Sequence, residues 1–211
     1  MTRPEGSKNE DYEVKRNKIL ESLFQKLVQK KFREFPSFRN VAKLLNVSPP
    51  TLKHYFQSRN GVMTALLTHI EIKGEAYLEK ILVPEGNGKE SIYKLLQYIT
   101  SGFESGPVGT IHQFGLSHGM GEKELGPSYL VHLFEPLLDA VERRLILHQK
   151  QNELIECEPR VAALFLISPL FLVLLHQKKL GGHKVRPLNI DEYLHNHTDI
   201  FWKAFAKKQK E

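Results

Sequence analysis

Cysteine is almost absent from the sequence, and this removes two kinds of chemistry from consideration. Cys157 is the only cysteine among 211 residues, so the chain has no partner for an intrachain disulfide. A lone free thiol is typical of a reducing compartment, and we expect the protein in the cytoplasm. Glu156 and Glu158 flank Cys157, and their negative charges disfavour the thiolate that a nucleophilic cysteine needs.

Long apolar runs are also scarce. The longest, residues 161–175, has 15 residues and contains Pro169, which we consider too short to span a bilayer. We expect instead a helix that is buried on several faces. Residues 1–10 are polar and lack the hydrophobic region of a signal peptide, so we expect a flexible arm that adds contacts to phosphates.

Motifs for catalysis and for metal binding are missing. The sequence contains no glycine-rich phosphate loop and no strand–turn–helix serine motif. Ten histidines raise the possibility of a metal site, but His195 and His197 are two residues apart and point to different faces of a helix. We therefore expect no enzyme activity, no metal and no cofactor. A helical enzyme without a recognisable set of catalytic residues remains the less favoured alternative.

The alternation of apolar and polar residues that is typical of strands is absent, whereas helical periodicity recurs throughout. In the first helix, an apolar stripe repeats with the spacing of one helical face. Its members are Leu20, Leu23, Phe24, Leu27 and Val28. Later helices are expected over residues 58–82, 90–103, 107–118 and 189–206. A further helix should start at Pro127 and be kinked at Pro136.

Residues 37–56, SFRNVAKLLNVSPPTLKHYF, have the pattern of a helix-turn-helix. Ser37 is placed to cap the first helix, and Ser48 to cap the second. Asn46 tolerates the left-handed backbone that a tight turn requires. Pro49 suits the first position of the second helix, where its missing N–H would be unpaired in any residue. A unit of this kind places its second helix in the major groove of DNA, so we expect DNA binding.

Positive charge is concentrated in the same part of the sequence. Residues 1–60 contain 13 Lys and Arg against 6 Asp and Glu, whereas residues 61–211 contain 17 against 18. The first third is thus near +7 and the remainder near −1, which sums to the +6 of the chain. A basic solvated surface that binds nothing is the alternative, but the coincidence of charge and motif favours DNA binding.

The second helix leaves a polar face exposed. Leu52 and Phe56 are four residues apart and point into a core. Thr51, Lys53 and Tyr55, with Pro50 and His54, are then left on the outside. Hydroxyl, ammonium, imidazole and phenol groups suit a surface of phosphates and base edges.

The N-terminal region resembles the DNA-binding domain of the TetR family of transcriptional regulators. The resemblance rests on ILESLFQKLV and KKFREF, on NVS where the family most often has Gly-Val-Ser, on the ending TLKHYF, and on SRNGVMTALL at the start of a long fourth helix. It implies an all-α fold of about nine helices, with a DNA-binding domain of three helices over residues 1–57 and a larger helical ligand-binding and dimerisation domain over 58–211. Asn46 replaces the usual Gly, and Lys53 replaces a frequent Tyr, so the operator sequence does not follow from the family.

The resemblance also implies which residues contact DNA. Thr51, Lys53 and Tyr55 would be the main contacts of the recognition helix, with Lys53 on a guanine edge or a phosphate. Arg59 matches a basic phosphate contact of the family. The full expected set is Ser37, Arg39, Ser48, Pro49, Thr51, Lys53, His54, Tyr55 and Arg59.

In the larger domain, the resemblance implies a repressor that a small-molecule inducer releases from a palindromic operator. A homodimer would form through the last two helices, so that two recognition helices read one palindrome. The aromatic and histidine residues that we expect around the inducer have a competing interpretation, which is that they only pack in the core. This domain also has a competing function, which is to dock a protein partner instead of a small molecule. The expected lining residues are Tyr98, Phe103, His112, Phe114, His118, Tyr129, His132 and Phe134.

Overall fold

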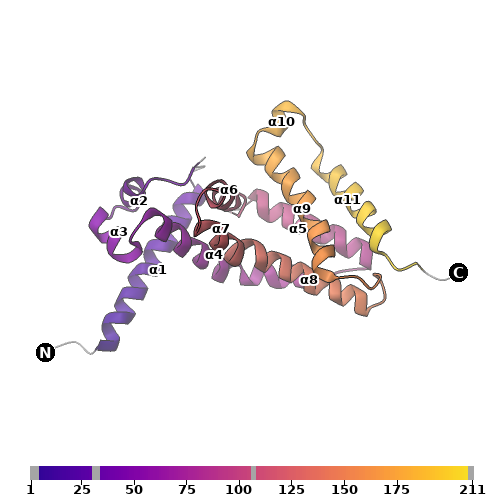
Figure 1. Ribbon diagram of the computed structural model, residues 1–211, viewed down its shortest axis with the longest axis horizontal. Coiled ribbons are helices and arrows are strands. Elements are labelled where there is room, and N and C mark those ends of the chain that lie inside the picture. The colour runs from indigo at the N-terminus through magenta and orange to yellow at the C-terminus, as the bar shows by residue number, and fades with distance from the viewer. Residues whose placement is uncertain (1–4, 30–33, 106–107, 209–211) are drawn as a thin grey trace. The chain divides into compact units, whose positions relative to one another are not determined.

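The computed structural model describes residues 5–29, 34–105 and 108–208, which are almost entirely helical (Figure 1). In this part of the chain the only β pairing is an isolated antiparallel bridge between Leu154 and Ala206. The all-α fold class is therefore confirmed. The helices are α1 (Glu5–Gln29), α2 (Phe38–Leu45), α3 (Pro49–Phe56), α4 (Arg59–Leu82), α5 (Gly88–Ser105), α6 (Val108–Gly119), α7 (Leu125–Tyr129), the π-helical turn η1 (Leu130–Phe134), α8 (Glu135–Lys150), α9 (Pro159–Leu174), the π-helical turn η2 (Leu175–Lys179), α10 (Gly182–Val185) and α11 (Ile190–Phe205).

The chain divides into two compact units. The first comprises Met1–Lys73 and Thr110–Leu133, and the second comprises Gly74–Gly109 and Phe134–Glu211. The helix-turn-helix lies in the first unit, which also contains α7 and most of α6 and η1. The boundary that we expected at residue 57 separates a DNA-binding domain from a ligand-binding domain. The compact units do not test this functional division, so it stays a prediction.

In the first unit, α1 supplies an apolar stripe to a small helical core. Leu20, Leu23 and Leu27 are buried, as the periodicity predicted. Phe24 is half-buried, and the side chain of Val28 lies outside the described part. The expectation of a flexible arm is wrong for Glu5–Glu10, which form the first turns of α1, while residues 1–4 lie outside the described part. Gly6, Ser7 and Asn9 are poor helix formers, so these residues extend α1 because adding a residue to an existing helix is easier than nucleating one.

Of the two prolines expected within helices, Pro136 adjoins a widened helical turn. η1 immediately precedes α8, and Pro136 occupies the first turn of that helix. Proline removes a backbone donor and clashes with the carbonyl four residues earlier, so regular α-helical bonding fails there. The expected disturbance at Pro136 thus takes the form of a π-helical turn. Pro169 lies inside α9, which ends in the second such turn, η2.

The apolar segment around Pro169 differs from our expectation in two respects. First, α9 and η2 form one helical run of 21 residues, Pro159–Lys179, which is long and apolar enough to cross a membrane by length and composition. The length argument made from the sequence is therefore wrong, although core helices pass the same test. Second, α9 is buried on one broad face only. That face consists of Ala162, Ala163, Leu166, Ile167, Leu170, Phe171 and Leu174.

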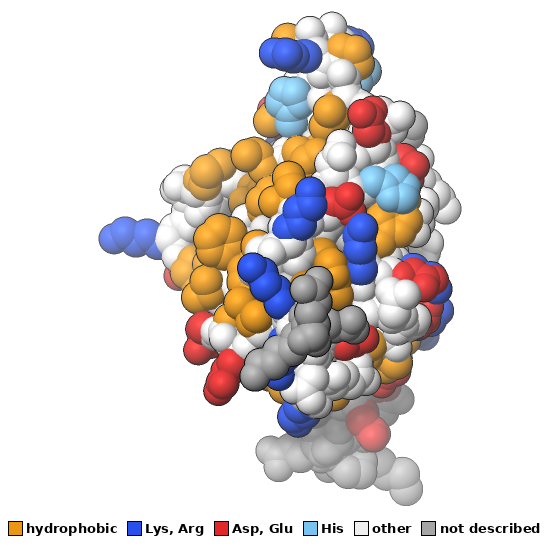
Figure 2. All heavy atoms as spheres, turned by 90° about the vertical axis from the view of Figure 1, so that its right-hand side faces the viewer, with side chains coloured by type: hydrophobic (Ala, Val, Ile, Leu, Met, Phe, Trp, Pro, Cys, Tyr) orange, Lys and Arg blue, Asp and Glu red, His pale blue; other side chains and the backbone are white. Residues whose placement is uncertain are grey.

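The opposite side of α9 is open to solvent. Val161, Phe165 and Leu172 are spaced by four and seven residues, and they are 47%, 61% and 64% exposed. Ile200 on α11 is 66% exposed. Figure 2 views the structure from the right-hand side of Figure 1, and on this face hydrophobic side chains lie next to Lys and Arg side chains. The second unit thus leaves apolar surface uncovered on both α9 and α11, the two helices expected to form a dimer.

Candidate nucleic-acid interface

The helix-turn-helix forms with the caps and the turn that the sequence predicts. The hydroxyl of Ser37 accepts from the backbone N–H of Asn40 at 3.3 Å. The hydroxyl of Ser48 accepts from the N–H of Thr51 at 3.1 Å, and it lies 2.7 Å from the Thr51 hydroxyl. Asn46 has φ 54° and ψ 42°, the left-handed conformation that ends α2. Both short helices are therefore fixed at their N-terminal ends by side-chain caps.

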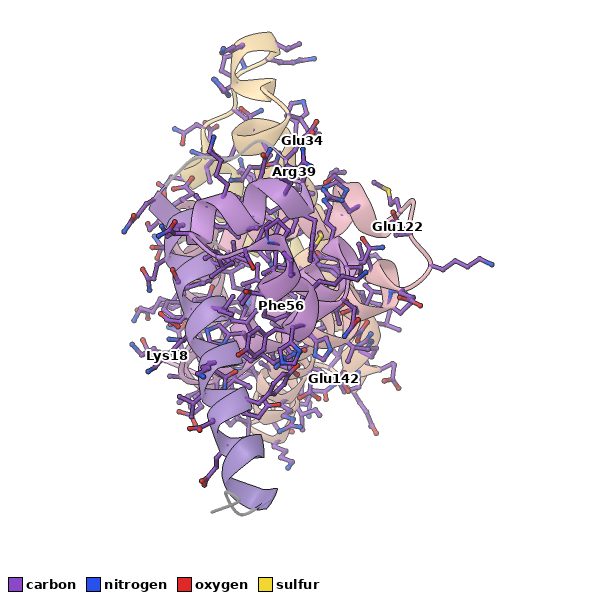
Figure 3. The ribbon with its side chains drawn as sticks, turned by 90° about the vertical axis from the view of Figure 1, so that its left-hand side faces the viewer. Lys18, Glu34, Arg39, Phe56, Glu122 and Glu142 are labelled. Carbon is purple, nitrogen blue, oxygen red and sulfur yellow. The ribbon has the colours of Figure 1, made fainter. Side chains whose placement is uncertain are left out.

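The buried side of the motif explains which residues remain free. Leu52 and Phe56 of α3 pack with Val41 and Ala42 of α2 in the core, all less than 5% exposed. Phe56 also lies against α1, where the guanidinium of Arg16 is 5.6 Å from the centre of its ring (Figure 3). Because this side of α3 is occupied, most of its other residues face solvent. The exposed members of the predicted contact set are Ser37, Arg39, Ser48, Pro49, Thr51, Lys53 and His54.

Tyr55 does not face outward as expected. It is half-buried, and the ring of Tyr12 on α1 packs on it with 4.8 Å between centroids. Tyr12 was not predicted, because it lies before the apolar stripe of α1 that begins at Leu20. Tyr12 and Arg16 are four residues apart and share a helical face, which is the signal that identifies this second contact between α1 and α3.

Arg59 is likewise engaged within the protein. Its guanidinium donates to the carbonyl of Phe35 at 2.8 Å and to that of Pro36 at 3.2 Å. One of its nitrogens lies 3.2 Å from Nε2 of His118, and it lies over the ring of Phe35 at 5.5 Å. In this arrangement Arg59 ties the start of α4 to the segment that leads into α2. The phosphate contact that the resemblance implied for Arg59 stays a prediction and needs these bonds to be exchanged.

Glu21 provides a further connection between α1 and α4. Its carboxylate accepts from Gln25 at 2.9 Å, from Lys73 at 2.6 Å and from Nε2 of His69 at 3.0 Å. The hydrogen bonds from Gln25, Lys73 and His69 lower the pKa of Glu21 to about 2. A charged Glu21 therefore holds α1, and with it the contacts of Tyr12 and Arg16, against α4.

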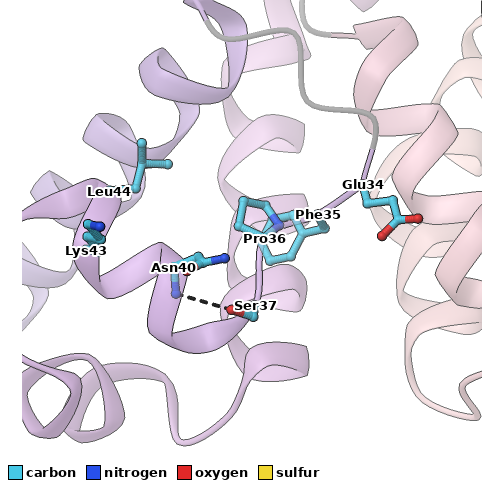
Figure 4. A pocket seen from close by; sticks show the side chains of 7 residues that line it. All are labelled: Glu34, Phe35, Pro36, Ser37, Asn40, Lys43 and Leu44. Atoms are coloured by element: carbon cyan, nitrogen blue, oxygen red, sulfur yellow. Dashed lines mark hydrogen bonds between the residues drawn. The ribbon is translucent and has the colours of Figure 1, made fainter.

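An open groove lies where the chain enters α2 (Figure 4). It has a volume of about 710 Å³, and the Glu34 carboxylate and Lys43 lie at its opposite ends. Ser37 and Asn40 line it between these charges. With an anion at one end and a cation at the other, the groove has no single sign of charge that would select a nucleic acid, so the exposed face of α3 remains the better candidate.

The expected inducer residues in the first unit are mostly paired with each other or with neighbours. His112 and Tyr129 are buried, and Nδ1 of His112 lies 2.8 Å from the Tyr129 hydroxyl. Burial lowers the pKa of His112 to about 3, so this imidazole is neutral at physiological pH. Phe114 packs on Phe35 and lines a small cavity of about 10 Å³, room for about one water molecule.

The two remaining candidates of the first unit contact charged groups. His118 meets Arg59, and burial, followed by the charge of Arg59, lowers the pKa of His118. Nδ1 of His132 lies 2.6 Å from the carboxylate of Glu71, and its Nε2 lies 3.4 Å from the hydroxyl of Thr68. His132 therefore fastens η1 to α4. An inducer role for either histidine stays a prediction.

In the second unit, the aromatic candidates belong to two clusters. Phe103 and Phe134 both pack on Phe171, with ring centroids 5.8 and 5.4 Å apart. Tyr98 stacks on Tyr77 at 4.6 Å, and burial raises the pKa of both phenols. These contacts are what core packing produces, and within this unit they do not place the three candidates around one ligand.

Comparison with solved structures supports the architecture over nearly the whole chain. A putative TetR-family transcriptional regulator from Mesorhizobium loti MAFF303099 aligns with TM-score 0.67 and 13% identity, covering 92% of this chain and 98% of its own. GusR from Salmonella enterica aligns with TM-score 0.63 and 18% identity, covering 89% and 95%. FadR from Bacillus subtilis, in complex with stearoyl-CoA, aligns with TM-score 0.62 and 12% identity, covering 87% and 95%.

No protein-family model matches the sequence, and no curated protein matches it either. The fold and the capped motif first define the class, an all-helical protein with a helix-turn-helix in its N-terminal unit. More particularly, the chain has the fold of the TetR-family transcriptional regulators. The resemblance noted in the N-terminal region thus extends to the fold of nearly the whole chain.

Proposed function

We propose that the protein is a sequence-specific DNA-binding transcriptional regulator of the TetR type. The observation that carries the proposal is the geometry of α3. This helix is capped at Ser48, its apolar side is buried, and Thr51, Lys53 and His54 are exposed in the part of the chain that holds the excess positive charge. A helix presented in this way fits the major groove, and Ser37 and Arg39 at the start of α2 are placed for phosphates.

Selection of DNA from a pool of duplexes with a randomised core tests this proposal. We expect the protein to enrich a palindrome, because a dimer presents two recognition helices. The upstream region of its own gene is a second source of candidate sites. Enrichment of no sequence, together with no retention of any selected duplex in a gel shift, would refute the proposed function.

Lys53→Ala then tests the recognition face. If Lys53 contacts a base, the substitution lowers affinity about 5-fold to 150-fold and relaxes preference at one position. If it contacts a phosphate, affinity falls evenly across sequences, and the slope of log affinity against log salt concentration becomes smaller by about one. Combining it with Tyr55→Phe removes a second contact of the expected set. Lys94→Ala on α5 is the matched control, since Lys94 is also exposed and pairs with Glu90 on its own helix.

For the larger domain, we propose that it binds a small-molecule inducer and that binding releases the protein from DNA, as a repressor in the cytoplasm. Support comes from the shared fold, because FadR from Bacillus subtilis is described with stearoyl-CoA bound. Release requires that the inducer bind one dimer state more tightly than the other. A thermal-shift screen against metabolites, fatty acids and hydrophobic cations should find one class that stabilises the protein. Stabilisation by none of them would favour docking of a protein partner.

We also propose that the protein is a homodimer through α9 and α11. The uncovered apolar residues Phe165, Leu172 and Ile200 support this assembly, since patches of this kind on a monomer mark interaction sites. Light scattering at micromolar concentration should give twice the chain mass of 24.3 kDa. A stable species of 24.3 kDa would contradict the dimer.

A further inference from the structure

The C-terminal end of α3 is held in an unusual way. Gln57 has φ 62° and ψ −50°, and the N–H of Ser58 bonds to the carbonyl of Phe56 at 2.6 Å. This is a γ-turn with positive φ, a rare and strained conformation for a residue other than glycine. Gly61 permits it, because a Cβ at that position would lie 2.0 Å from the carbonyl oxygen of Phe56.

The tight turn has a consequence for the carbonyls of the last turn of α3. A helix leaves its final carbonyls without intrahelical donors, and here Ser58 donates to Phe56 and is lost to His54. The hydroxyl of Tyr12 lies 3.4 Å from the carbonyl of His54 and 3.4 Å from that of Tyr55. The single O–H of Tyr12 is equidistant from the two carbonyls and donates a long hydrogen bond to one of them at a time.

The ring of Tyr12 is engaged at the same place. It packs on Tyr55 at 4.8 Å and meets the imidazole of His54 edge-on at 5.4 Å with an interplanar angle of 81°. One turn further along α1, Arg16 lies over the ring of Phe56. Three consecutive residues at the end of α3 are therefore held by two side chains of α1.

We propose that Tyr12 is a positioning residue for DNA reading: it fixes the last turn of α3 and the direction of His54 without contacting DNA itself. The proposal rests on the proposed function, because it concerns how the recognition face is presented. It follows from the size of α3. An eight-residue helix is marginal by itself, so its last turn depends on tertiary contacts. Tyr12 bonds to the backbone of His54 itself. Greater mobility of that backbone would therefore change the direction of the His54 side chain on the exposed face.

Two variants separate the parts that Tyr12 plays. Tyr12→Phe removes the hydroxyl and keeps the ring, and Tyr12→Ala removes both. Tyr93→Phe on α5 is the matched control, since it deletes a hydroxyl that donates to Asp191 at 2.8 Å in the second unit. Hydrogen–deuterium exchange of the peptide spanning residues 49–58 gives a readout that needs no DNA.

We expect Tyr12→Phe to speed exchange in this peptide roughly threefold to tenfold, as loss of one neutral hydrogen bond predicts, and Tyr12→Ala to speed it more. Tyr93→Phe should leave the peptide unchanged. Unchanged exchange in both Tyr12 variants would overturn the inference, whatever DNA the protein binds.

The second readout is the duplex that the wild-type protein selects from the randomised pool. We expect Tyr12→Phe to weaken binding to it by a similar factor, to broaden base preference at the positions nearest the end of α3, and to leave binding to a scrambled duplex unchanged. Equal affinity and equal preference would overturn the inference while the proposed function stands. A wild-type protein that selects no duplex refutes the proposed function itself, and with it the role of Tyr12 in reading DNA, even if Tyr12 stabilises α3.

Discussion

The carboxylate of Glu21 helps to hold α1 against α4, and its titration predicts how the stability of the fold changes with pH. Because its pKa is lowered from 4.5 to about 2 in the folded protein, the charged form stabilises the fold above pH 4.5. That contribution is lost as the pH falls from 4.5 towards 2. It is modest, since the side chain is 37% exposed and water screens its partners.

Glu21→Gln should therefore lower the melting temperature slightly at pH 7, and the difference from the wild type should shrink at pH 3.5. Thermal melts followed by circular dichroism at pH 7, 5 and 3.5 measure this, and added salt should reduce the effect. Glu10→Gln, an exposed carboxylate on the same helix, serves as the control. A difference that grows on acidification would show that the Glu21 interactions have been assigned incorrectly.

At the scale of elements, the cap of α3 should affect both the stability of the protein and the proposed DNA binding. Ser48→Ala removes the acceptor for the Thr51 N–H and should cost about 1 kcal/mol in the free energy of unfolding. Ser48→Asp restores the cap but places a negative charge beside the phosphates. Urea unfolding should thus show recovery in Ser48→Asp, whereas binding to the selected duplex stays weak. Full recovery of binding would mean that the N-terminal end of α3 does not approach the DNA backbone.

A buried arginine joins three helices of the second unit. Arg144 on α8 is 2% exposed, and it donates to the carbonyls of Ile81 and Val83 at the end of α4. It also donates to the carbonyl and the hydroxyl of Ser91 on α5 at 3.0 and 2.7 Å. Burial lowers the pKa of Arg144 to about 10, so the guanidinium remains protonated at neutral pH.

Arg144→Met should destabilise the protein by about 3 kcal/mol or more, because several buried acceptors lose their donor and each costs about 1–3 kcal/mol. Arg143→Met is the control on the neighbouring residue. Arg143 is 62% exposed and pairs with Asp139, so its loss should stay within about 0.5 kcal/mol. Chemical denaturation measures both variants, and equal effects would contradict a structural role for Arg144.

At the scale of the whole molecule, the proposed dimer depends on the open face of α9. Phe165→Glu and Leu172→Glu place charges on that face and should convert the proposed dimer to a monomer, with weaker binding to a palindromic duplex. Ile72→Glu on α4 is the control, since Ile72 is 62% exposed and therefore similar to Phe165 and Leu172. Sedimentation or light scattering gives the masses. If only Ile72→Glu dissociated the dimer, the assignment of the dimer interface to α9 would be contradicted.

Local interactions account for what the sequence alone determined. The caps at Ser37 and Ser48, the left-handed Asn46 and the position of Pro49 were all predicted, because each depends on residues within four positions. The all-α class follows from the same short-range periodicity. The exposed positions of Lys53 and His54 follow in turn, since burial of Leu52 and Phe56 leaves them no other face.

Only the tertiary structure decided which side chains are already engaged. Tyr55 meets Tyr12 across 43 residues, and Arg59 meets carbonyls 23 and 24 residues before it, so no local pattern reveals either contact. The same holds for α9, which is apolar on almost every side although one side lies open to solvent. A residue's periodicity states which face of a helix it occupies. What covers that face depends on segments that are distant in sequence and are brought close only by folding.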